Sequence, residues 1–121
     1  MYKRQVKEVV PSKPVPAHLN TYTFGEEEKF ANNLSKPRTF VFERTNGEWV
    51  INGLPWNGRV AAAPKVGTVE KWVLQNKSGG WFHPVHIHLV DFHIVKRNGH
   101  DPFPYEKGWK DVVFVGSVRC V

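Results

Sequence analysis

The sequence predicts an all-β fold, a sandwich or a barrel, formed by a single domain. Three observations support this expectation. The chain has 121 residues, which is the usual size of one folding unit. From residue 38 onward, short runs of β-branched and aromatic residues alternate with turn residues, as in proteins built from many short strands. No segment has the periodicity of a long amphipathic helix, and the sequence contains no internal repeat.

The first expected element of the β body is a hairpin. The runs FVFE, Phe40–Glu43, and EWVI, Glu48–Ile51, flank the pair Asn46-Gly47. Asn-Gly between two such runs favours a tight turn, because both residues tolerate positive φ. The run VEKWVLQN, Val69–Asn76, predicts a further strand.

The remaining predicted elements surround a histidine-rich strand. Residues 78–80, Ser-Gly-Gly, form an expected turn before it, and the pair Asn98-Gly99 is expected to close a strand pair after it. The valines of DVVFVGSV, Asp111–Val118, predict the final strand.

Residues 1–37 are interpreted as a proline-rich linker or tail, and residues 38–121 as the β-rich domain. Each proline removes a backbone donor and restricts the residue before it, which favours extended connecting structure. The segment GEEEKFANNL, Gly25–Leu34, is polar and predicts a short helical turn at the surface. The prolines concerned are Pro11, Pro14, Pro16 and Pro37.

Composition argues against several functions. The net charge is +6, but the basic residues are scattered, so we expect no nucleic-acid partner. No apolar run approaches the ~20 residues of a spanning helix, so we expect no membrane partner. The N-terminus lacks the apolar segment of a secretory signal, and the sequence indicates no compartment. Cys120 is the only cysteine, which excludes an intrachain disulfide and a cysteine-rich zinc site.

Four of the six histidines lie in WFHPVHIHLVDFHIVKRNG, residues 81–99. In a strand, His86 and His88 share one face, ~6.5 Å apart along the chain. Pro84 is expected to break the register, so that His83 faces a different centre. Unpaired imidazoles buried in an apolar strand would cost stability, so this cluster predicts that the histidines bind a metal ion. Imidazole suits zinc, copper, iron or nickel. The other histidines, His18, His93 and His100, are interpreted as hydrogen-bonded or exposed.

The segment HPVHIHLVDF, His83–Phe92, resembles the His-Pro-x-His-x-His motif of multicopper oxidases, in their last plastocyanin-like (cupredoxin) domain. Its Leu-Val-Asp-Phe continuation is more similar to the bilirubin-oxidase-like branch than to plant or fungal laccases. The resemblance covers about residues 38–117, including FVFERTNGEWVINGLPWNG upstream and PYEKGWKDVVFVG downstream. It implies a cupredoxin-like Greek-key β-sandwich.

The resemblance implies a copper role for each motif histidine. His83 would be a ligand of the type 1 copper, which takes electrons from the reducing substrate. His86 would be a ligand of the type 2 copper and His88 of the type 3 pair. Together these ions form the trinuclear centre at which oxygen is reduced to water.

Other residues near the motif are weaker candidates. Trp81 would pack beside the type 1 site, and Asp91 or Asp111 would orient histidines or backbone groups. Trp109 would lie near a substrate entrance, in a loop with Tyr105 and Lys107. For each of them, a role in packing or at a turn or strand end is the alternative.

One part of the family pattern does not occur in this sequence. The family carries a second motif, His-Cys-His followed by another histidine and an axial methionine. Cys120 has no histidine after it, and the only methionine is Met1. We therefore expect a fragment or shortened form in which residues 38–121 make a partial domain, with an unpaired sheet edge and no turnover by itself. Missing domains or another chain would complete the copper sites.

Three hypotheses remain open. The chain is a copper-binding part of an oxidase whose full-length form oxidises small phenolic or tetrapyrrole-like substrates with oxygen. Alternatively, it is a non-catalytic module in which His86 and His88, with or without His83, hold one metal ion. In the third hypothesis it is a purely structural β-domain.

Overall fold

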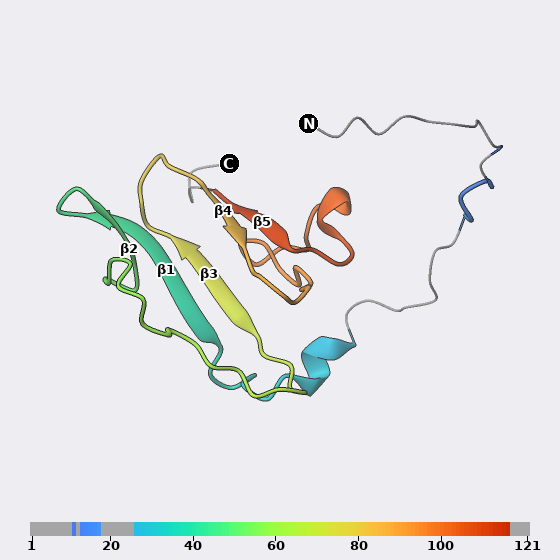
Figure 1. Ribbon diagram of the computed structural model, residues 1–121, viewed down its shortest axis with the longest axis horizontal. Helices are drawn as coiled ribbons and strands as arrows, with labels where there is room; N and C mark the ends of the chain where they lie inside the picture. The colour runs from blue at the N-terminus through green and yellow to red at the C-terminus, as the bar shows by residue number, and fades with distance from the viewer. Residues whose placement is uncertain (1–10, 12, 18–25, 117–121) are drawn as a thin grey trace, which may run out of the picture.

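The computed structural model describes residues 11, 13–17 and 26–116, and it confirms the all-β expectation (Figure 1). Within these residues the helical elements are two short 3₁₀ turns, and the first of them confirms the predicted surface turn. The elements in chain order are η1 (Glu27–Phe30), β1 (Arg38–Thr45), β2 (Glu48–Ile51), β3 (Trp72–Asn76), β4 (His83–His86), η2 (Pro104–Glu106) and β5 (Val112–Val115).

The first sheet has three strands in the order β2-β1-β3. β1 and β2 form the predicted hairpin, and its turn residues have φ angles of 52° at Asn46 and 84° at Gly47. These positive values are the reason for the Asn-Gly pair. β3 joins the other edge of β1 in parallel, with Phe40 opposite Leu74. The predicted strand at residues 69–76 therefore exists, but it begins only at residue 72.

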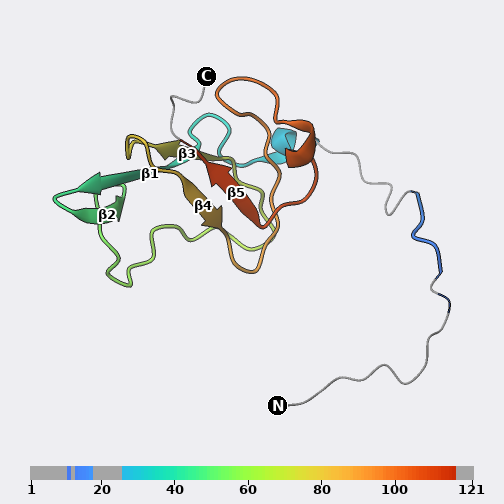
Figure 2. The same ribbon diagram turned by 90° about the horizontal axis from the view of Figure 1, so that it is seen from above.

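The second sheet pairs β4 with β5 in antiparallel fashion, and this pair lies beside β3 (Figures 1 and 2). The expectation that Asn98-Gly99 closes the histidine strand pair was wrong. That dipeptide makes a local turn, closed by hydrogen bonds between Arg97 and His100. The final strand is confirmed over Val112–Val115, and residues 117–118 lie outside the described part of the chain.

The histidine-rich strand is shorter than predicted and Pro84 does not interrupt it. β4 runs from residue 83 to residue 86, with Pro84 opposite Phe114. Proline is tolerated here because β4 pairs with a partner on one side only. The strand ends where the backbone turns, and Leu89 has a φ of 77° with its side chain fully exposed.

Residues 26–37 pack along the β body. Ala31 is buried and bridges Val69, and the side chain of Asn33 bonds both the N–H and the carbonyl of Lys71. Part of the segment interpreted as a linker thus contacts the chain just before β3. The domain boundary at residue 37 stays a prediction.

The buried apolar core is small. Within the described residues it comprises Ala31, Phe40, Val50, Val113 and Val115. Phe40 packs on Trp72 with ring centroids 4.8 Å apart. Many large apolar side chains remain exposed, Trp56 to 92%. No helix in the described part of the chain is long and apolar enough to cross a membrane.

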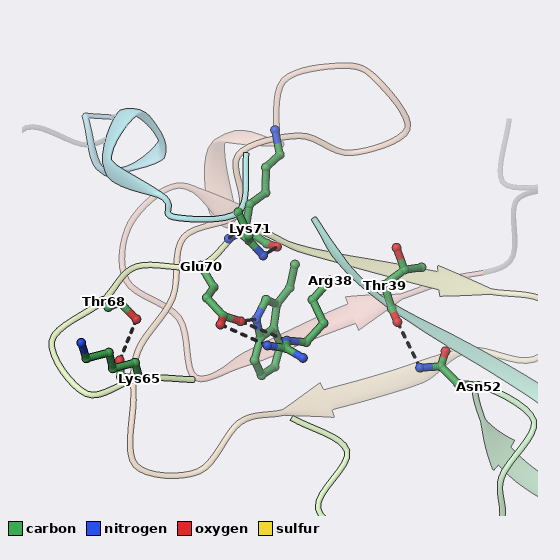
Figure 3. Close-up of polar contacts among 9 residues, drawn as sticks. Arg38, Thr39, Asn52, Lys65, Thr68, Glu70 and Lys71 are labelled. Atoms are coloured by element: carbon green, nitrogen blue, oxygen red, sulfur yellow. Dashed lines mark hydrogen bonds and ion pairs between the residues drawn. The ribbon is translucent and has the colours of Figure 1, made fainter. Parts of the chain in front are cut away.

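Polar contacts fasten the start of β1 to the chain before β3 (Figure 3). Arg38 donates two hydrogen bonds to the carboxylate of Glu70, at 3.0 and 3.1 Å, and the indole N–H of Trp72 donates a third at 2.8 Å. These donors, Arg38 first, lower the pKa of Glu70. On the other side of β1, Asn52 donates to the Thr39 carbonyl (Figure 3). Side-chain contacts as well as strand pairing therefore join β1 to the segments on both sides of it.

A second ion pair holds the loop after β4 against β5. Arg97 binds the carboxylate of Glu106 through both Nε and a terminal nitrogen, and it also donates to the Phe114 carbonyl at 2.9 Å. The Phe103 N–H donates to the same carboxylate. Glu106 is buried, and its pKa is lowered chiefly by the hydrogen bond from Arg97.

Candidate metal centre

The alternation of β4 separates the two histidines at its ends. His83 is opposite Val115, which is buried, and His86 is opposite Val112, which is exposed. Directly opposite residues share a face of an antiparallel pair, so His83 points to the inner face and His86 to the outer face. The two imidazoles therefore have different surroundings, as predicted, although alternation rather than a register break at Pro84 causes it.

His86 and His88 lie together. Their ring centroids are 4.7 Å apart with an interplanar angle of 57°. The Nδ1 atom of His86 is 2.8 Å from the main-chain carbonyl oxygen of Asp111. Because a carbonyl only accepts, the proton of neutral His86 lies on Nδ1 and its lone pair lies on Nε2. A backbone carbonyl that orients an imidazole in this way is typical of metal-binding histidines.

His83 lies among aromatic rings instead. It stacks on Phe42, with centroids 5.3 Å apart, and it meets the edge of Trp49 at 5.4 Å. Its Nε2 atom is 2.8 Å from the hydroxyl of Ser78. This imidazole is therefore held by packing on one side and by a hydroxyl on the other.

The weaker candidates lie in different places. Trp81 meets Trp49 edge to face, with ring centroids 5.5 Å apart, and Trp49 in turn meets His83. Trp109 packs on His93 with centroids 3.9 Å apart. Asp91 is exposed and makes no hydrogen bond or ion pair with the described residues.

The donor set in the described residues is partial. No group of three or more histidine, cysteine or carboxylate side chains there is arranged to hold a metal ion. An open cavity of about 510 Å³ lies beside β4, and its lining is largely apolar apart from the three motif histidines. The other residues that line it are Phe40, Phe42, Ile51, Trp72, Leu74, Pro84, Val85 and Ile87. Two adjacent imidazoles, one with a fixed proton, fit part of a ligand shell that other donors would complete.

Sequence reasoning missed the residues that orient the histidines. Ser78 lies in a predicted turn and Asn76 at the end of a predicted strand, yet both belong to the network that reaches His83. Asp111 was considered, and its main-chain carbonyl is the group that contacts His86. A serine five residues before a histidine is a weak signal, because the turn between them determines whether they meet.

The family model described as multicopper oxidase matches residues 11–119 of this chain. The chain belongs to the multicopper oxidase family. The match includes residues 11–37 as well as the segment that carries the motif.

Two of the relatives match more than four fifths of the chain. Bilirubin oxidase from Albifimbria verrucaria is 43% identical over 114 residues, 88% of this chain and 19% of the relative. Laccase from Bacillus subtilis strain 168 is 31% identical over 81% of this chain and 23% of the relative. The chain thus spans about a fifth of the length of these relatives. The bilirubin-oxidase-like and laccase-like resemblance is confirmed.

Other comparisons broaden the range of relatives. The cell division protein FtsP from Escherichia coli strain K12 is 39% identical over 59% of this chain and 15% of the relative. No solved structure gives a significant match.

Proposed function

We propose that this chain supplies copper ligands to a multicopper oxidase, with His83 at the type 1 site, His86 at the type 2 site and His88 at the type 3 site. The observation that carries the proposal is the adjacent pair of imidazoles after β4, 4.7 Å apart, in which the Asp111 carbonyl fixes the proton of His86. Family membership makes copper the metal favoured among those that imidazole binds.

The chain's own residues hold and orient the donors. Copper bound by such ligands supplies one-electron transfer from a reducing substrate and the reduction of oxygen. The Asp111 carbonyl keeps the Nε2 lone pair of His86 available. Phe42 and Trp49 pack against His83 and restrict its ring, so less freedom is lost when it binds a metal.

The full-length protein, in this proposal, oxidises phenolic or tetrapyrrole-like molecules and reduces oxygen to water. Residues 38–121 form part of its C-terminal plastocyanin-like domain, and residues 1–37 lead into that domain. Other domains or another chain supply the remaining copper ligands. The partial donor set and the exposed large apolar side chains of the described residues support this arrangement.

A non-catalytic metal-binding module is the second candidate function. It needs only the adjacent imidazoles of His86 and His88, whose ring centroids lie 4.7 Å apart. It also agrees with a relative that is named for cell division rather than for an oxidase activity. In this role His86 and His88 would hold one ion, with water or a partner chain completing the shell.

A copper titration of the full 121-residue chain tests metal binding. We expect stoichiometric copper on the wild type, loss of that copper in His86→Ala/His88→Ala, and retention in His100→Ala, a matched control at an exposed histidine. Unchanged copper in the double variant would contradict the proposed ligands. Oxygen consumption with a phenolic or bilirubin-like donor then separates the two functions. The 121-residue chain by itself is expected to show no turnover in either case, whereas the full-length protein consumes oxygen only in the first.

A further inference from the structure

Asn76 is one of the buried polar residues of the described chain, with 6% of its surface exposed. Its Nδ2 atom donates to two main-chain carbonyls, those of Trp81 at 2.6 Å and Val115 at 3.3 Å. Its Oδ1 atom accepts from the main-chain N–H of Ser78 at 2.9 Å. Carbonyls cannot donate and an N–H cannot accept, so these partners fix which end of the amide is oxygen.

The amide oxygen then fixes the hydroxyl of Ser78. Ser78 Oγ lies 2.5 Å from Asn76 Oδ1 and 2.8 Å from His83 Nε2. Oδ1 carries no hydrogen, so the single hydroxyl hydrogen must lie between the two oxygens; otherwise their lone pairs would face each other at close range. The hydroxyl is therefore the acceptor in its contact with the imidazole.

We infer that Ser78 and Asn76 are positioning residues that hold the proton of His83 on Nε2 and keep its Nδ1 lone pair available to a metal ion. A neutral imidazole carries one proton, so a proton on Nε2 leaves Nδ1 as the acceptor. Within the described residues, Nδ1 of His83 makes no hydrogen bond. The part of this inference that concerns metal binding rests on the proposed function. The position of the proton rests only on the hydrogen bonds among Asn76, Ser78 and His83.

The two ends of β4 consequently present opposite nitrogens. His86 carries its proton on Nδ1, bonded to the Asp111 carbonyl, and exposes Nε2. His83 carries its proton on Nε2 and exposes Nδ1. A metal ligand needs a free lone pair at the nitrogen that faces the ion, and the hydrogen bond at the other nitrogen selects it. One strand thus orients two imidazoles for separate centres.

Long-range ¹H–¹⁵N correlation spectra of the metal-free, ¹⁵N-histidine-labelled full chain test the proton position at an alkaline pH, where imidazoles are neutral. We expect His83 to show a protonated Nε2 and an unprotonated Nδ1. Ser78→Ala should give a mixture of both tautomers. Ser78→Thr should restore the wild-type pattern because it keeps the hydroxyl, and Ser35→Ala, at an exposed serine, should change nothing.

A proton on Nδ1 of His83 in the wild type would overturn the inference, as would an unchanged tautomer in Ser78→Ala. The wild-type spectrum tests the inference even if a variant fails to fold. A chain with the expected tautomer that binds no copper would refute the proposed function and leave the positioning of the proton supported.

Discussion

The Nδ1 atom of His86 lies 2.8 Å from the main-chain carbonyl oxygen of Asp111, so the β4–β5 pair itself orients this imidazole. The residue opposite His86 is Val112, and Asp111 comes directly before it. Strand register thereby determines which nitrogen of His86 is available. The contact joins the fold of the second sheet to the chemistry that the histidine motif can perform.

Removal of the Asp111 carboxylate should have little effect on the site. The carboxylate oxygen is 3.8 Å from Nδ1 and its side chain is 68% exposed, whereas the orienting group is the main-chain carbonyl. An exposed ion pair contributes at most about 1 kcal/mol, which corresponds to about fivefold in affinity. We expect Asp111→Ala to bind copper within about fivefold of the wild type in the same titration. A loss as large as that of His86→Ala/His88→Ala would show that the carboxylate, not the carbonyl, orients the ring.

Glu106→Gln should destabilise the chain by roughly 3 kcal/mol, because it leaves Arg97 without a charged partner at a site where the Glu106 side chain is 8% exposed. The measurement is urea unfolding followed by tryptophan fluorescence. Glu26→Gln is the matched control, since Glu26 pairs with Lys29 on the surface and should change stability by less than about 0.5 kcal/mol. Equal effects of the two variants would contradict the structural role of the buried pair.

Stability should fall in acid. A carboxylate whose pKa is lower in the folded than in the unfolded chain stabilises the fold above the unfolded pKa, and this contribution is lost as the pH falls through the folded pKa. Hydrogen bonds from Arg97 and from Arg38 lower the pKa of Glu106 and Glu70, respectively, below the usual glutamate value of 4.5. We expect the free energy of unfolding to decline below about pH 4.5, less steeply in Glu106→Gln. An identical decline in that variant would be the contrary result.

Gly47→Ala should destabilise the hairpin by about 1 kcal/mol, since a β-carbon is strained at a φ of 84°. Open space surrounds this position, so backbone strain rather than a steric clash is tested. Gly80→Ala is the control, at a glycine that also has open space but no positive φ. Thermal unfolding of both variants compares their midpoints. Equal midpoints would argue against backbone strain at Gly47.

The sequence allowed the fold class and several elements to be predicted, because they depend on local rules. The turn at Asn46-Gly47 and the valines of β5 are signals of this kind, and both elements were found. The pairing of β4 with β5, which brings Asp111 to His86, joins residues 25 positions apart. Nothing local specifies such a partner, and the prediction that the nearby turn at Asn98-Gly99 closes the histidine-rich strand pair was therefore wrong.

The candidate site, like the fold, could be predicted from the sequence only in part. The sequence analysis expected a register break at Pro84 to turn His83 toward a different centre from His86. The pairing of β4 with β5 places the two histidines on opposite faces, but by alternation along an unbroken strand. The proximity of His86 and His88 was also expected, but it arises at the end of β4 rather than within a strand. The hydroxyl and amide that contact His83 could not be predicted, since the path of residues 76–83 decides whether they meet.

Pulsed electron paramagnetic resonance of the Cu(II)-loaded, full 121-residue chain tests the central claim most directly, because it detects the nitrogens of imidazoles bound to copper. We predict imidazole coupling in the wild type and in His100→Ala, and loss of that coupling in His86→Ala/His88→Ala. Imidazole coupling that persists unchanged in the double variant, or copper that binds without any imidazole coupling in the wild type, would contradict the assignment of these histidines as copper ligands.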